Sequence, residues 1–205
     1  MPQMKSAVRP LPIMTALAFL PFGAGIIVGA IVSSKLVTRF APREVAAPAA
    51  LIGGAALFWL ANIGQELNYM WHFMPAAFLT AFGFVGAVIA LALTAVKGVQ
   101  TQETGIASAL FNASQQIGVA LGLAVLSTIA VSATAGRLPG ALAALYRGRE
   151  TGDAGLVRSA SDALIHGYGL ALAGAGAALV IAAVIAAVLV NAKRGQVSTG
   201  TIAVH

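Results

Sequence analysis

The chain has 205 residues, of which 59% are hydrophobic and 9% are charged, and its mean hydropathy is +0.91. Soluble domains carry about 25% charged residues, so this composition excludes an ordinary soluble domain and predicts an all-α integral membrane protein. The net charge of +6 comes from basic residues that lie mostly beside apolar runs, which is typical of topology determinants and not of a nucleic-acid surface.

Five apolar runs approach the length of about 20 residues that a spanning helix needs. They cover about 14–32, 45–63, 74–96, 105–131 and 164–190. The first run contains Pro21, which is expected to kink a helix because proline lacks an amide donor. Gly25 and Gly29 follow at a spacing of four, which predicts close packing against another helix.

A short basic loop connects the first two spans. It carries Lys35, Arg39 and Arg43, with Pro42 as a helix breaker. Two interpretations stay open, a cytoplasmic gating latch and a set of topological anchors.

The fourth span, about 105–131, carries amide side chains in its first half. Asn112 and Gln116 share one helical face and Gln115 lies beside them. Amides are costly in a bilayer unless they are paired, so they either line a substrate cavity or make interhelical hydrogen bonds. Gly118 and Gly122 follow and predict helix packing.

Residues of about 132–163 form the long connection, predicted to be an extracytoplasmic loop with one or two short interfacial helices. The tail of about 195–205 is predicted to be disordered. Five spans place the termini on opposite sides, and the basic residues divide six against six. The first group lies in short loops, which favours the cytoplasm for that group and for the C-terminus. This group is Lys35, Arg39, Arg43, Lys97, Lys193 and Arg194.

Enzymatic function is not expected, since the chain has no H-E-x-x-H, G-x-S-x-G or Walker A sequence and no cysteine. No metal or cofactor is expected either. The six carboxylates fall in predicted loops or at predicted helix ends, so a proton-carrying acid within the membrane is expected outside this chain. His166, near the start of the fifth span, is either an interfacial anchor or a titratable group.

Two segments resemble fourteen-helix drug:proton antiporters of the major facilitator superfamily. The first resembles the family's Thr-Gly-Leu-Ala-hydrophobic-Leu-Pro run and basic loop, and the second its G-x-A-S-x-L-x-N-x-x-x-Q-x-G pattern. The matching residues are Thr15, Leu17, Ala18, Leu20, Pro21, Gly25, Gly29, Arg39, Pro42 and Arg43, and then Gly105, Ala107, Ser108, Leu110, Asn112, Gln116 and Gly118. Alanine at position 41, where the family often has glycine, is expected to loosen the basic turn. Gln115 replaces a frequent arginine.

The resemblance implies helices ten to fourteen of such a transporter, in a bacterial inner membrane. It implies export of amphipathic or cationic organic compounds in exchange for protons, with the missing N-terminal helices or a second copy as partners besides the lipid bilayer. Superfamily members alternate access by rocking two halves around a central site, so this chain is not expected to transport alone. The alternative is a small non-transporting membrane assembly protein.

Overall fold

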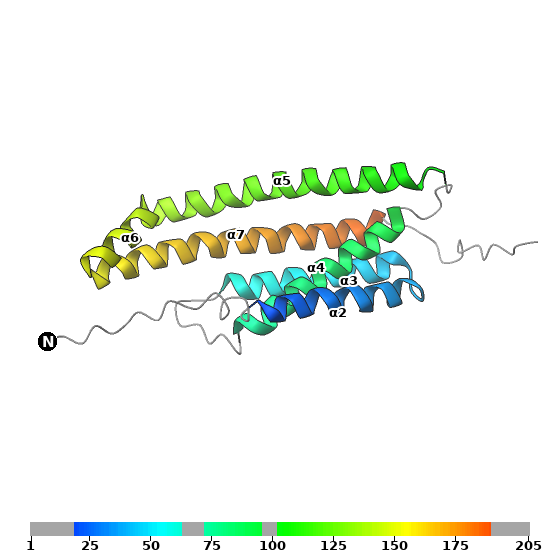
Figure 1. Ribbon diagram of the computed structural model, residues 1–205, viewed down its shortest axis with the longest axis horizontal. Coiled ribbons are helices and arrows are strands. Elements are labelled where there is room, and N and C mark those ends of the chain that lie inside the picture. The colour runs from blue at the N-terminus through cyan, green and yellow to red at the C-terminus, as the bar shows by residue number, and fades with distance from the viewer. Residues whose placement is uncertain (1–18, 63–71, 96–101, 190–205) are drawn as a thin grey trace, which may run out of the picture.

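The computed structural model describes residues 19–62, 72–95 and 102–189. Within these ranges the chain forms helices joined by short turns (Figure 1). In chain order they are α2 (Leu20–Val37), α3 (Pro42–Ala61), α4 (Met74–Ala95), α5 (Thr104–Arg137), α6 (Ala141–Thr151) and α7 (Ala154–Leu189). The predicted C-terminal tail lies outside the described residues.

Five of these helices are long and apolar enough to cross a membrane, which confirms the predicted all-α membrane fold. At a rise of about 1.5 Å per residue, α2 to α4 are about 27–33 Å long, close to the thickness of about 30 Å of the hydrocarbon core. The 34 residues of α5 and the 36 residues of α7 are about 50 Å long by the same rise. These two helices therefore exceed the bilayer core by about 20 Å.

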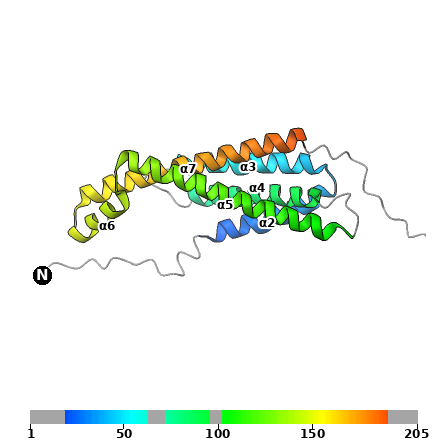
Figure 2. The ribbon, with the colours of Figure 1, turned by 90° about the horizontal axis from the view of Figure 1, so that it is seen from above.

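The spanning helices form an open row, not a closed bundle. α2 packs on α4, α4 on α3, α3 on α7, and α7 on α5, while α4 touches α5 only slightly. Figure 1 shows α5 at one edge of this row and α2 towards the other, and Figure 2, seen from above, shows α5 running across the helices behind it. The arrangement leaves one long flank of α5 without a neighbour in the described part of the chain.

The centre of the row is built from alanine and glycine. Ala46, Ala76, Ala81 and Ala90 are each at most 1% exposed. Small residues let helix backbones approach closely, and dispersion between packed atoms supplies much of the attraction in a membrane, where lipid is as apolar as the side chains. A Cβ added to Gly29 would lie 2.7 Å from the carbonyl oxygen of Phe82. Gly25 and Gly29 thus lie directly against the backbone of α4.

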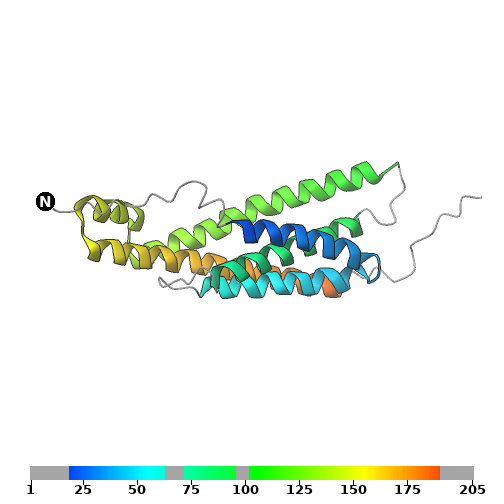
Figure 3. The ribbon, with the colours of Figure 1, turned by 60° about the horizontal axis from the view of Figure 1, so that its bottom comes forward.

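The predicted connection at 132–163 contains one short helix, as expected, but α5 and α7 extend further into it than the predicted span bounds. α5 continues to Arg137, α6 turns back, and α7 already begins at Ala154. Gly140 and Gly152 adopt the positive φ angles of 70° and 74° that reverse the chain at the two ends of α6. α6 packs on α7 beyond the ends of α2 to α4, as Figures 1 and 3 show.

The start of α7 has a side-chain cap. The Asp153 carboxylate accepts hydrogen bonds from the backbone amides of Gly155 (2.9 Å) and Leu156 (3.0 Å). These amides have no partner within the first turn of the helix. Asp153 therefore fixes where α7 starts outside the apolar segment.

Two predictions near the N-terminal end need correction. Pro21 lies in the first turn of the described helix, where a missing amide donor costs no hydrogen bond, so it is not an interior kink there. Ala41 has φ of −65° and ψ of 142°, which any L-residue adopts, so alanine does not loosen this turn. Its amide donates a hydrogen bond of 3.2 Å to the Glu44 carboxylate.

The hydroxyl oxygen of Thr80 on α4 is buried and has no hydrogen-bond partner in the described part of the chain. Thr80→Val keeps the shape and removes the uncompensated polar atom, so we expect it to stabilise the purified protein by up to about 1 kcal/mol. The measurement is the thermal unfolding midpoint in detergent.

The matched control for that substitution is Thr94→Val on the same helix. The Thr94 hydroxyl donates to the Ala90 carbonyl at 2.8 Å, so its removal is expected to be neutral or destabilising. A Thr80→Val variant that unfolds at a lower temperature than Thr94→Val would contradict the expectation.

Candidate functional site

The amide side chains of α5 lie on the unpartnered flank of the row. Asn112, Gln115 and Gln116 are all exposed. Apolar neighbours on the same segment are exposed as well, with Leu110 at 68% and Ile117 at 61%. Ala107, Ser108 and Phe111 on another face are half-buried, and the face that carries the amides is uncovered within the described residues.

Gly118 and Gly122 continue the same unpartnered segment. A Cβ added at either position would meet no atom within 4 Å. Gly25 and Gly29 are buried against α4, whereas the glycines of α5 face open space in the described chain. The predicted packing face of Gly25 and Gly29 is therefore covered by a helix of this chain, and the face of Gly118 and Gly122 is not covered in the described residues.

The basic residues of the first loop are distributed over a tight turn between helices. Lys35 lies in the last turn of α2, Arg39 in the turn itself, and Arg43 in the first turn of α3, directly after Pro42. Proline is favourable at this first helical position, because its fixed φ suits the helix and its missing donor is not needed. Lys35 and Arg39 are exposed, and Arg43 is half-buried.

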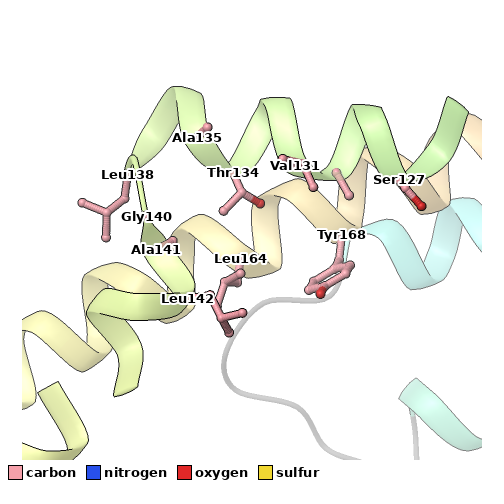
Figure 4. A pocket seen from close by; sticks show the side chains of 11 residues that line it. Ser127, Val131, Thr134, Ala135, Leu138, Gly140, Ala141, Leu142, Leu164 and Tyr168 are labelled. Atoms are coloured by element: carbon pink, nitrogen blue, oxygen red, sulfur yellow. The ribbon is translucent and has the colours of Figure 1, made fainter. Parts of the chain in front are cut away.

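An apolar pocket of about 360 Å³ lies between the C-terminal half of α5, the start of α6 and α7 (Figure 4). Leu138, Leu142 and Leu164 line it. Its polar groups are the hydroxyls of Ser127, Thr134 and Tyr168. The lining carries no charged side chain, which suits an apolar occupant.

A second pocket, of about 560 Å³, lies where the end of α3, the end of α5 and α7 meet. Its polar side chains come from three helices: Asn62 from α3, Arg137 from α5, and both Asp162 and His166 from α7. Phe58, Ile165 and Leu170 supply apolar surface. We call this site the polar pocket.

Sequence reasoning missed the polar pocket because it assigned Asp162 and Arg137 to a loop. In the structure Asp162 lies within α7, four residues before His166, so the two side chains share one helical face. The i, i+4 spacing of an acid and a histidine was the available signal. Tyr168 and Leu164 point to the apolar pocket, on a different face of α7.

The fold and these sites define a multi-pass helical membrane protein with polar side chains set among apolar helices. The family model of the Major Facilitator Superfamily matches residues 1–123. The chain therefore belongs to the Major Facilitator Superfamily, as the sequence motifs predicted.

Three relatives are similar to this chain. The puromycin resistance protein pur8 of Streptomyces alboniger is 34% identical over 187 residues, which cover 89% of this chain and 34% of that protein. The cephamycin export protein CmcT of Amycolatopsis lactamdurans is 33% identical over 121 residues, covering 59% of this chain and 25% of that protein. The uncharacterized MFS-type transporter EfpA of Mycobacterium tuberculosis is 31% identical over 166 residues, covering 80% of this chain and 29% of that protein. The chain thus spans about a third or less of each relative.

Proposed function

We propose that this chain forms the C-terminal part of a multidrug exporter and that it exports only together with further helices. The substrates are amphipathic organic compounds, exchanged for protons in the inner membrane of a bacterium. The names of the relatives support this class, because two refer to antibiotic export or resistance. The proton-carrying carboxylate is assigned to the helices outside this chain, as the scarcity of acids in its spans suggests.

One observation carries the proposal: the N-terminal half of α5 exposes amides and glycines on an apolar helix. Unpaired amides facing lipid cost free energy, because hydrocarbon offers no hydrogen-bond partners. Further helices facing Asn112 and Gln116 would cover these amides or enclose a polar cavity with them. Gly118 and Gly122 leave room for such a helix to approach closely.

The same observation favours a transporter part that packs against N-terminal helices over a non-transporting assembly protein. A second copy of the chain is the alternative partner. The position of Lys35, Arg39 and Arg43 in a tight turn supports a cytoplasmic location for that turn and for the C-terminus, by the positive-inside rule.

The proposal is tested in a chimera in which this chain replaces the matching segment of the puromycin resistance protein. We expect the chimera to protect a puromycin-sensitive bacterium, whereas this chain alone, inserted in the membrane at equal level, gives no protection. Puromycin efflux from the isolated chain would contradict the need for further helices.

We further expect Asn112→Ala with Gln116→Ala to lower the resistance given by the chimera about tenfold, the effect of losing about 1.4 kcal/mol of hydrogen bonding. The matched control is Thr128→Ala, also exposed on α5, whose hydroxyl donates to the Ala124 carbonyl at 2.8 Å. If the double variant and the control gave equal resistance at equal protein level, Asn112 and Gln116 would not line the substrate cavity.

A further inference from the structure

The polar pocket combines a size, a shape and a charge that suit a small organic ligand. Its volume of about 560 Å³ falls within the range of about 300–1,000 Å³ that small-molecule sites occupy. Phe58, Ile165 and Leu170 provide apolar surface beside the polar side chains of Asn62, Arg137, Asp162 and His166. A ligand with an apolar body and a polar end matches this division.

The charged side chains of the polar pocket indicate which charge the polar end of a ligand carries. Arg137 contributes +1 and Asp162 contributes −1, so these two side chains together are neutral. Arg137 is the lining group that can pair with an anionic ligand. A guanidinium also presents paired N–H donors that match the geometry of a carboxylate or a similar oxyanion.

The remaining charged groups near α7 do not change this balance within the lining. The end of α3 contributes the neutral Asn62, and α5 contributes Arg137. On α7, Arg158 lies one turn before Asp162, and α6 carries Arg147, Arg149 and Glu150, all outside the lining. With Asp153, which caps the start of α7, these are five further groups with a net charge of +1, so the surroundings of the pocket are slightly positive.

We propose that the polar pocket binds an amphipathic organic anion. Arg137 holds the anionic group, Asp162 weakens the attraction, and the apolar wall covers the body of the ligand. The role of the pocket as a site on the export route rests on the proposed function, whereas binding is measured on this chain without transport.

The probe is naphthalene-2-sulfonate, an anion with an apolar body. Binding is measured by equilibrium dialysis of the full chain in lipid nanodiscs, with empty nanodiscs subtracted and neutral naphthalene-2-sulfonamide as the matched ligand. We expect the sulfonate to bind about tenfold more tightly than the sulfonamide, the effect of one charge paired with Arg137 at close range.

Three substitutions separate specific binding from loss of structure. Arg137→Gln is expected to weaken sulfonate binding about tenfold, and Asp162→Asn to strengthen it, so the two act in opposite directions, which unfolding cannot produce. A third substitution, Arg137→Lys, keeps the charge but not the paired N–H donors and is expected to bind with intermediate affinity. Lys35→Gln, an exposed basic residue at the opposite end of the row, is the control and is expected to bind as the wild type does.

The proposal is overturned if Arg137→Gln binds as tightly as Lys35→Gln, if Asp162→Asn weakens binding, or if the neutral sulfonamide binds as tightly as the sulfonate. The proposed export function fails on different evidence, namely a chimera that gives no puromycin resistance. If the chain binds the sulfonate but the chimera gives no resistance, the polar pocket is an anion-binding site that has no role in export.

Discussion

Gly83→Ala on α4 is expected to cause a large loss of stability although it adds only one methyl group. The added Cβ would overlap the Ala49 carbonyl oxygen and the Gly53 amide nitrogen of α3, and would lie 2.7 Å from the Gly53 Cα atom. These are backbone atoms, which cannot rotate away as a side chain can. The helices must separate.

Separation of α3 and α4 disturbs a third helix as well. Gly54 lies beside Gly53 on α3, and its carbonyl oxygen would lie 3.0 Å from a Cβ added to Gly176 on α7. Overpacking costs about 1–3 kcal/mol, and rigid contacts place Gly83→Ala at the upper end. A loss of about 3 kcal/mol corresponds to a decrease of about 6–12 °C in the unfolding midpoint.

The measurement is thermal unfolding in detergent, combined with the fraction of protein that elutes as a single species. Gly118→Ala is the matched control, since it adds the same methyl group to open space. Alanine also favours helix over glycine by about 1 kcal/mol, so the control is expected to be neutral or stabilising. Equal midpoints for the two variants would contradict the close approach of α3 and α4.

Gly167→Val is expected to detach α5 from α7, the second large effect. A Cβ at position 167 would overlap the Thr134 hydroxyl and would lie 2.5 Å from the Ala130 carbonyl oxygen. α7 is the main neighbour of α5 in the described chain, so loss of this contact leaves α5 held mainly through α6. We expect little change in helix content and a large change in helix proximity.

Proximity is measured by cross-linking Leu126→Cys to Gly174→Cys, because a Cβ at Gly174 lies 3.2 Å from the Leu126 side chain. The chain has no native cysteine, so no background cross-link forms. We expect Gly167→Val to lower the yield several-fold and Gly136→Val, which adds its side chain to open space on α5, to leave it unchanged. Adding Thr134→Ala should restore part of the yield if the hydroxyl overlap contributes.

Local sequence predicted the five spans because length and hydropathy determine whether a helix can cross a bilayer. Local sequence placed the end of α5 too early and the start of α7 too late around residues 132–163, because the charged residues there were interpreted as a loop. A helix outside the hydrocarbon tolerates charge, and hydropathy does not distinguish it from a loop. Leu138-Pro139-Gly140 and Gly152-Asp153 did mark the turns that bound α6, together with the cap on α7.

The sites were predictable only where one helix carries them. Asn112 and Gln116 share a face by simple periodicity, and the structure places them on an exposed segment. The polar pocket joins Asn62, Arg137 and His166 from three helices, and their proximity depends on how far α5 and α7 extend beyond α3. A single sequence does not contain this information, because it depends on how the helices pack against one another.

The close contacts of α5 with the glycines of α7 lie towards one end of α5. Leu126, Ala130 and Thr134 lie against α7 there, whereas most side chains before Gly122 are exposed and α4 touches α5 only slightly. Asn112 lies about 21 Å from Leu126 along the helix axis, at about 1.5 Å per residue. A rotation of α5 by about 10° about these contacts would therefore displace Asn112 by about 4 Å. The same rotation would move Arg137 in the polar pocket far less, because Arg137 lies close to these contacts.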